Sequence, residues 1–232
     1  MKTIGLIGGM SWESSAEYYR IINQMVKKEL GEPHSCECIM YSVDFFEIEK
    51  LQHQGAWDEL TERMIDIART LEDAGADLII LCTNTMHKMA GAIEDNITVP
   101  FLHIADAVAK EIKARGMSKV GLLGTKFTME GDFYKERLHN EHEIDVIVPG
   151  ENDRDTVHGI IYHELISGII KDDSRNQVKV VIDTLSASGA EGVVLGCTEI
   201  PLLIKSHDSS IPVFDTTTIH AKKAVEFALN NA

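Results

Sequence analysis

The sequence carries one strand-and-helix plan twice, and this internal repeat limits the folds open to the chain more than any other feature. Three pairs of segments match in the same order along the two halves. The offsets drift by only a few residues, as changes in loop length would cause. The repeat predicts a duplicated α/β unit, although unrelated strands of one larger sheet would give similar matches. The matching pairs are residues 5–8 with 121–124, 75–83 with 189–197, and 99–100 with 211–212.

Short apolar runs alternate with longer amphipathic stretches from end to end, as strands joined by crossover helices do. The sequence therefore predicts the α/β class, with two similar parallel-sheet domains related by pseudo-twofold symmetry. We expect residues 1–104, completed by 209–232, to form the first domain and 105–208 the second. The expected strands are 3–7, 36–43, 78–81, 99–104, 120–123, 144–148, 192–195 and 211–214, and the expected helices include 16–30, 57–74, 105–115 and 177–188.

Composition narrows the functional classes before any motif is considered. The formal charge of −15 argues against a protein that binds a nucleic-acid backbone. No apolar run approaches the roughly 18 residues of a membrane helix, and the first residues lack the pattern of a signal peptide. Four cysteines in a chain of 232 residues do not make a disulfide framework. These features predict a soluble cytoplasmic protein.

Polar and small residues follow four of the expected strands, at their carboxyl ends. Ligands of open parallel sheets bind beyond these ends. A pseudo-twofold pairing of the two halves would bring all four loops to one cleft, with Cys197 and Thr83 in equivalent places on opposite walls. The loops are Gly8-Gly9-Met10-Ser11, Thr83-Asn84-Thr85, Gly124-Thr125 and Cys197-Thr198-Glu199.

These loops resemble those of the aspartate/glutamate racemase family. Its hallmark segments, Cys-Asn-Thr-x-His and Gly-Cys-Thr-Glu, read here Thr83-Asn84-Thr85-Met86-His87 and Gly196-Cys197-Thr198-Glu199. The resemblance spans essentially the whole chain, including its duplication. It implies a racemase that interconverts L- and D-amino acids, of the aspartate/glutamate type or of broader range, without pyridoxal phosphate or another cofactor. It also implies a homodimer that acts on a small amino-acid substrate.

One position departs from the family pattern. Thr83 stands where the family has its first catalytic cysteine, and a cysteine lies one position earlier, at Cys82. The internal repeat gives the same pairing, because it sets Cys197 opposite Thr83. Neighbouring residues of a strand point to opposite faces, so we interpret Cys82 as a buried structural thiol.

The resemblance assigns removal of the α-hydrogen of L substrates to Cys197. A thiolate suits this role because its pKa, ordinarily about 8.5, can be lowered at a helix N-terminus, where we expect Cys197 to lie. Thr83 is a poor base. Its hydroxyl can nevertheless return a proton to the opposite face of a strongly basic carbanion.

The other site predictions concern substrate binding. Backbone amides of the two hallmark segments would hold the α-carboxylate as negative charge grows in the transition state. Gly8 and Gly9 would allow close backbone approach, whereas Ser11 and Thr125 are either substrate contacts or helix caps. The predicted binding residues are Gly9, Met10, Ser11, Asn84, Thr85, Thr125, Thr198 and Glu199.

Two residues of the hallmark segments have open roles. His87 either orients its own loop, at Thr83 or Asn84, or makes a core contact. Glu199 either receives the substrate ammonium, tunes Cys197, or is a solvated carboxylate that complements a helix N-terminus.

Residues that would select a substrate side chain or bind a metal are less evident. Arg154, His158 and His163 could bind a second carboxylate, yet none stands out as a clamp, so a broader substrate range stays open. Cys36 and Cys38 lie two residues apart, and no second ligand pair follows at zinc spacing. We therefore interpret these cysteines as core residues and predict no metal site.

Two other functions fit the same loops. A single catalytic cysteine suits decarboxylation of an arylmalonate-like acid, and hydantoin racemisation is a further carbanion chemistry of the superfamily. Alternatively, loss of the first cysteine would leave an amino-acid-binding protein with weak turnover. Exchange of the substrate α-hydrogen with solvent separates these functions, because a pure binder gives none and a decarboxylase releases carbon dioxide.

Overall fold

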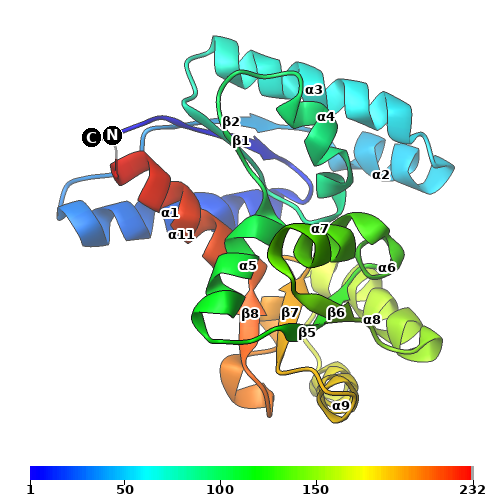
Figure 1. Ribbon diagram of the computed structural model, residues 1–232. Coiled ribbons are helices and arrows are strands. Elements are labelled where there is room, and N and C mark those ends of the chain that lie inside the picture. The colour runs from blue at the N-terminus through cyan, green and yellow to red at the C-terminus, as the bar shows by residue number, and fades with distance from the viewer. Residues whose placement is uncertain (231–232) are drawn as a thin grey trace. The chain divides into compact units, whose positions relative to one another are not determined.

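The computed structural model describes residues 1–230 and divides the chain into two compact units (Figure 1). Residues 1–103 and the chain from His220 onward form the first unit, and residues 104–219 form the second. Within the described residues, each unit contains one four-stranded parallel sheet flanked by helices. The prediction of an α/β protein with two similar parallel sheets is confirmed.

The first sheet has the strand order β2-β1-β3-β4. Its strands are β1 (Ile4–Gly8), β2 (Cys38–Ser42), β3 (Leu78–Leu81) and β4 (Phe101–Leu102). The central strands β1 and β3 are buried throughout, which explains why their sequences are apolar without alternation. The edge strand β2 has no fully buried residue.

Helices cover both faces of this sheet. They are α1 (Trp12–Leu30), α2 (Phe45–Gln54), α3 (Trp57–Asp73), the 3₁₀ helix η1 (Thr85–Met89), α4 (Ala90–Glu94) and α11 (Thr216–Leu229). Helices α2 and α3 pack on one face, and α1 and the second part of α11 pack on the other (Figure 1). The apolar residues of α3 recur at helical spacing and form one buried face. They are Leu60, Met64, Ile67, Ala68 and Leu71.

The second sheet repeats the first, with the strand order β6-β5-β7-β8. Its strands are β5 (Lys119–Gly124), β6 (Asp145–Ile147), β7 (Gly192–Gly196) and β8 (Val213–Asp215). β5 and β7 take the central places that β1 and β3 take in the first sheet. The internal repeat therefore corresponds to two separate sheets, and not to strands of one larger sheet.

The helices of the second unit also lie on both faces of the sheet. They are α5 (Ile104–Ala114), α6 (Lys126–Glu130), α7 (Asp132–His142), α8 (Glu151–His163), η2 (Leu165–Ser167), α9 (Asp172–Ala187), α10 (Ile200–Leu203) and η3 (Ser206–Asp208). Helices α5 and α7 share a core cluster with one face of the sheet, and α8 and α9 with the other.

The chain returns to the first unit later than residue 209. β8 pairs with β7 in the second sheet, and the first unit resumes only at His220. Residues 231–232, the end of the predicted first domain, lie outside the described residues.

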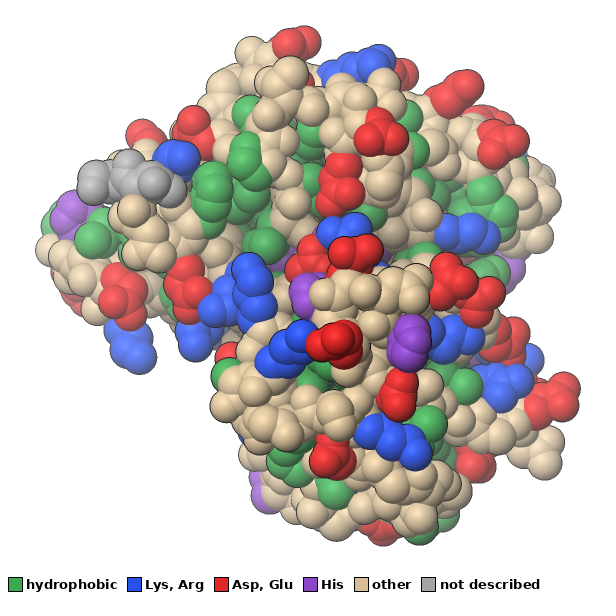
Figure 2. All heavy atoms as spheres, in the orientation of Figure 1, with side chains coloured by type: hydrophobic (Ala, Val, Ile, Leu, Met, Phe, Trp, Pro, Cys, Tyr) green, Lys and Arg blue, Asp and Glu red, His purple; other side chains and the backbone are tan. Residues whose placement is uncertain are grey.

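Charged side chains of both signs are mixed on the face shown in Figure 2, where no continuous basic patch forms. This distribution agrees with the net negative charge of the sequence. None of the helices within residues 1–230 combines the length and the apolar character needed to cross a bilayer.

A cluster of buried histidines lies in the first unit. The rings of His87, His103 and His220 are each at most 3% exposed, and His87 lies 4.7 Å from His103 and 5.8 Å from His220, centroid to centroid. The His220 Nε2–H donates to the Leu102 carbonyl at 2.9 Å, so Nδ1 accepts from the Tyr18 hydroxyl at 2.9 Å. These bonds fix the neutral tautomer and connect α11 to α1 and β4.

Burial lowers the pKa of His220 from 6.5 to about 4, and burial together with the two other rings holds the pKa of His87 well below its usual value. In the unfolded chain these rings bind protons as the pH falls below about 6.5, whereas in the folded chain they do not. The contribution of these two histidines to the free energy of unfolding is therefore fully present above pH 6.5 and is lost as the pH falls toward 4.

We expect His220 alone to remove roughly 3 kcal/mol from the free energy of unfolding between pH 6.5 and pH 4. Urea titrations across this range should give a shallower loss for His220→Gln, in which the amide can still donate to Leu102. The same change at the exposed His34 is the control and should leave the slope unchanged. An NMR titration that shows His220 protonated near pH 6.5 in the folded protein would contradict the expectation.

Candidate active site

The predicted site residues follow the central strands of the two sheets directly. Residues 9–11 follow β1 and residues 83–85 follow β3, so both loops lie at the same edge of the first sheet. Their segments also touch, because the Ser14 hydroxyl donates to the Cys82 carbonyl at 3.4 Å. Thr125 follows β5 and residues 197–199 follow β7, at one edge of the second sheet. Each unit therefore brings together two of the four predicted loops.

The loop after β1 is held by two serines. Ser11 is the N-cap of α1, where its hydroxyl accepts from the Ser14 amide at 3.3 Å. Ser15 receives the Gly9 amide at 2.7 Å and donates to the Ser11 carbonyl at 3.0 Å. Ser15 is a positioning residue that the sequence analysis missed. Its only sequence signal is its place four residues after a helix-capping serine.

Gly9 meets a constraint from its own chain. Its φ is +92°, and a Cβ atom at this position would lie 2.3 Å from the Val43 carbonyl oxygen. We expected this glycine to allow close backbone approach, and in this structure the approaching backbone is the loop after β2. The side chain of Met10 is buried in the core cluster beneath α2 and α3.

The loop after β3 separates Cys82 from Thr83. Cys82 is fully buried and packs with α1 and α11, and burial raises the pKa of its thiol. The expected burial of Cys82 is confirmed, and its structural role stays a prediction. Thr83 is half-buried. The His87 Nδ1–H donates to the Thr83 carbonyl at 2.8 Å, so this imidazole holds the backbone of the loop.

The two remaining positions of this loop differ in exposure. Asn84 is 3% exposed, whereas Thr85 is half-buried. In the second unit, Thr125 is the N-cap of α6, and its hydroxyl accepts from the Thr128 amide at 3.3 Å. The hydroxyl groups of Thr125 and Thr128 also lie 3.3 Å apart. Thr125 therefore caps a helix, as Ser11 does in the first unit.

The loop after β7 contains a compact hydrogen-bonded group. The Cys197 thiol donates to Glu199 Oε2 at 3.0 Å, and the Thr198 hydroxyl donates to the same oxygen at 2.7 Å. Cys197 is 7% exposed and Glu199 is 8% exposed. The Glu199 carboxylate is therefore not a solvated surface group. It accepts two hydrogen bonds from residues of its own loop.

The electrostatics of Cys197 differ from the expectation of a lowered pKa. Burial and the negative charge of Glu199 raise the pKa of the thiol well above its usual value. Hydrogen bonds from the backbone amides of Glu199 and Ile200 act in the opposite sense and are outweighed. The helix that follows, α10, has only four residues, so it offers little of the dipole that a long helix would supply. Cys197 is consequently a neutral thiol in this structure.

The residues proposed for a second substrate carboxylate have other partners. Arg154 Nε contacts Glu130 Oε1 at 3.0 Å, and its Nη1 donates to the Pro149 carbonyl at 2.8 Å. His158 accepts from the Lys126 amide at 3.3 Å, next to the Thr125 loop. His163, at the end of α8, is exposed. Of the three, only His158 lies beside a predicted site loop.

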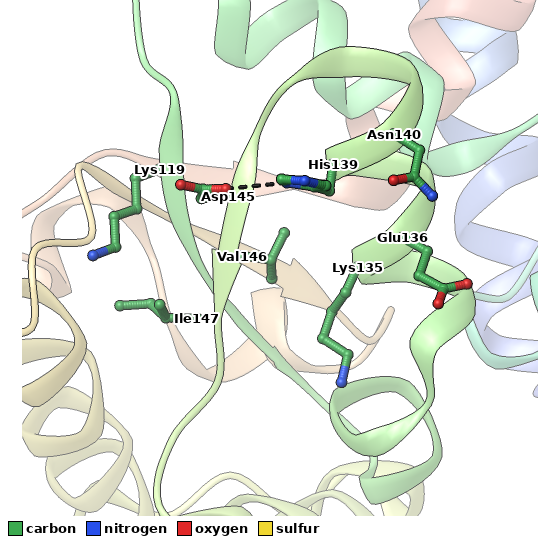
Figure 3. Close-up of a pocket in the computed structure, with 8 residues that line it drawn as sticks. All are labelled: Lys119, Lys135, Glu136, His139, Asn140, Asp145, Val146 and Ile147. Atoms are coloured by element: carbon green, nitrogen blue, oxygen red, sulfur yellow. Dashed lines mark hydrogen bonds and ion pairs between the residues drawn. The ribbon is translucent and has the colours of Figure 1, made fainter.

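A surface pocket of about 450 Å³ opens elsewhere in the second unit (Figure 3). Lys119, at the start of β5, and Asp145, at the start of β6, line it together with residues of α7. His139 Nδ1 lies 3.1 Å from Asp145 Oδ1. None of the predicted site residues lines this pocket, because they follow the opposite, carboxyl ends of the strands. Among the described residues, no three His, Cys, Asp or Glu side chains converge as metal ligands do.

Comparison with known proteins connects the whole chain to one family. The sequence pattern of the Asp/Glu/Hydantoin racemase family matches residues 7–224. A solved structure from Yersinia pestis, assigned to the Asp/Glu racemases, is 53% identical with a TM-score of 0.94 and covers 99% of this chain and 100% of its own. An aspartate racemase homologue from Pyrococcus horikoshii is 38% identical with a TM-score of 0.86, over 98% of this chain and 99% of its own. The broad specificity amino-acid racemase RacX of Bacillus subtilis is 25% identical over 96% of both chains.

Replacing Glu199 with glutamine should lower the pKa of Cys197, because the carboxylate charge and the hydrogen bond that it accepts both raise this pKa. We expect the pH midpoint of Cys197 alkylation by iodoacetamide, followed by peptide mass spectrometry, to move to lower pH. Glu191→Gln is the control, since Glu191 precedes β7 and accepts from Ser118 and Lys119. An unchanged or higher midpoint in Glu199→Gln would show that the carboxylate does not govern this thiol.

Proposed function

The chain belongs to the Asp/Glu/hydantoin racemase family and is an amino-acid racemase of that family, and we propose that it racemises its substrates without a cofactor, through Cys197 and Thr83. The observation that carries this proposal is the hydrogen-bonded Cys197–Glu199 pair at the carboxyl end of β7. The pair places a protonated thiol against a carboxylate whose charge sets the cost of ionising that thiol. Such a pair can supply the base that α-hydrogen removal needs.

Binding of the substrate would convert Cys197 into its reactive form. The negative charge of Glu199 is one of the two main causes of the raised thiol pKa. A substrate ammonium placed against Glu199 would offset that charge, so the thiolate would form at lower cost. In this scheme Glu199 both receives the ammonium and adjusts Cys197. Catalysis therefore starts only when an amino acid is bound.

The reaction then moves two protons. The Cys197 thiolate takes the α-hydrogen of the L-amino acid, and the electron pair left on Cα gives a carbanion stabilised by the adjacent carboxylate. The Thr83 hydroxyl returns a proton to the opposite face and gives the D-amino acid. Exchange of one proton with water restores both groups. A hydroxyl can act as the acid here because the carbanion is more basic than the Thr83 alkoxide that forms when the hydroxyl gives up its proton.

Backbone amides would stabilise the transition state. The amides of Glu199 and Ile200 already reach the Cys197 sulfur, where they favour its anionic form. We assign the amides of Asn84 and Thr85 to the substrate carboxylate. One such donor is commonly worth about 3–4 kcal/mol in a transition state. His87 supports the loop because it holds the Thr83 carbonyl at 2.8 Å.

The partners of Arg154 in the second unit favour a broad substrate specificity. The Arg154 guanidinium is engaged by Glu130 and the Pro149 carbonyl, so it does not serve as a clamp for a substrate side-chain carboxylate. We therefore propose that neutral amino acids are accepted together with aspartate and glutamate. A homodimer and a cytoplasmic location remain further predictions.

The racemase mechanism is tested by proton NMR in deuterium oxide, following the α-hydrogen of a panel of L-amino acids, with chiral chromatography of the products. Cys197→Ser should slow α-hydrogen washout at least about 100-fold, because general base catalysis is lost. Thr83→Ala should slow formation of D product more than it slows washout from the L-enantiomer. Cys82→Ala should retain both activities, since this thiol packs in the core.

Three outcomes would contradict the mechanism. Washout that survives Thr83→Ala but is lost with Cys82→Ala would assign the second role to the cysteine. Carbon dioxide release from an arylmalonate would indicate a decarboxylase. No exchange for any amino acid by the folded protein would leave a binding protein.

We expect Arg154→Gln to change aspartate and alanine turnover in the same proportion, because the guanidinium contacts Glu130 and not a substrate side chain. The measurement is the ratio of kcat/KM for the two amino acids, and Arg69→Gln in the first unit is the matched control. A selective loss of aspartate turnover, by about 10-fold or more, would identify Arg154 as a carboxylate clamp.

A further inference from the structure

Two cysteines that the proposed function does not use lie at the start of the edge strand β2. Cys36 is 9% exposed and Cys38 is half-buried, and both pack with the core cluster of α1 and α11. Cys38 also lines a pocket of about 360 Å³. The pocket is rimmed by Trp12 and Tyr19 of α1, which are 68% and 52% exposed. Of the two thiols, Cys38 is therefore the one that a small reagent can reach.

The two thiols lie close enough for one to donate a hydrogen bond to the other. The Cys36 thiol lies 3.3 Å from the Glu37 carbonyl and within hydrogen-bond reach of the Cys38 sulfur. A thiol proton serves one acceptor at a time, and an anionic sulfur is a stronger acceptor than a neutral carbonyl. When Cys38 ionises, the Cys36 proton therefore turns toward it. Burial keeps the proton on Cys36 and leaves the charge at the pocket.

The ionisation of the pair supports this division of roles. The hydrogen bond from Cys36 lowers the pKa of Cys38 to about 7 although burial opposes it, whereas the pKa of Cys36 is raised. The ionisable neighbours that act on the pair are few. Glu37 raises the pKa of Cys36, and Cys38 itself raises that of the buried Cys82.

The spacing of the pair allows a covalent bond. Two residues apart in extended chain, Cα atoms are about 6.6 Å from each other, which is inside the range of disulfides. Two hydrogen bonds hold the segment just before β2, because the Cys36 amide donates to Asn23 Oδ1 at 2.9 Å and the Glu37 carbonyl accepts from the Ile4 amide at 3.0 Å. Closure of the disulfide therefore needs the segment to shift between these two points. Cys82, which is fully buried, is not exposed to the pocket.

We propose that Cys36 and Cys38 are a peroxide-sensitive pair that closes to a disulfide, with Cys38 as the attacking thiolate. The Cys38 thiolate attacks one oxygen of hydrogen peroxide, the O–O bond breaks, and sulfenic acid and hydroxide form. The Cys36 sulfur then attacks the Cys38 sulfur. The S–O bond breaks, the Cys36 proton goes to the departing oxygen, and one water is released. Peroxide is reduced and the two thiols are oxidised by two electrons.

The test is peptide mass spectrometry of the full chain after stoichiometric peroxide, with and without later reduction by dithiothreitol. The wild-type protein should lose two hydrogen atoms from the peptide that carries residues 36–38, and dithiothreitol should restore them. Cys36→Ser cannot close the bond, so its Cys38 should stop at sulfenic acid and be trapped by dimedone. Cys38→Ser should show neither product.

A second readout separates the hydrogen bond from the cross-link. Alkylation of Cys38 should have its midpoint near pH 7 in the wild-type protein. In Cys36→Ser the hydroxyl can still donate, so the midpoint should stay low. In Cys36→Ala it should rise toward the ordinary value of about 8.5. Three results of peroxide treatment of the wild-type protein would overturn the proposal. Both thiols could stay reduced, Cys38 could be oxidised without a bond to Cys36, or Cys38 could be linked to Cys82.

Discussion

Parallel pairing of the two central strands in each sheet is the constraint on which the site depends. β1 pairs with β3 and β5 pairs with β7, in register and in the same direction. Every loop that leaves these strands therefore emerges at the same edge of its sheet. β1, β3 and β7 are buried throughout, and β5 is buried after its first residue, Lys119, so polar groups are excluded from the rest of these strands until they end. The proposed catalytic side chains, Thr83 and Cys197, are consequently found in the first residues after these strands.

Close packing at these strand ends fixes the loops before any substrate is bound. Gly9 is held against the Val43 backbone, and Gly196 lies so near the Leu123 carbonyl that a Cβ would approach it to 3.0 Å. Ser15 and His87 then hold the first unit's two loops through backbone atoms. Pre-organisation of this kind places donors without a reorganisation cost at the moment of reaction.

In the proposed mechanism, the neutral resting thiol at Cys197 makes activity depend on the binding of the substrate. A permanently ionised cysteine next to Glu199 would place two negative charges in a buried loop, which burial makes costly. Sharing the proton with the carboxylate avoids this cost. At Cys38 the neighbouring group lowers the pKa of the thiol, because that neighbour is a hydrogen-bond donor and not an anion. Neighbouring groups, more than residue type, decide the reactivity of each cysteine.

The sequence by itself determined the α/β class, the duplicated sheet and the positions of the four loops, because apolar strand runs and repeat spacing are properties of the chain's own order. It also separated Cys82 from Thr83, since alternation along a strand is fixed by backbone geometry. The pKa of Cys197, the partners of Arg154, and the gathering of His87, His103 and His220 were decided only by the tertiary structure. These properties depend on burial and on charges brought together from distant segments, and no spacing in the sequence encodes such distances. The sequence predicted a helix N-terminus beside Cys197, whereas folding placed a buried carboxylate there, and the carboxylate outweighs a helix of four residues.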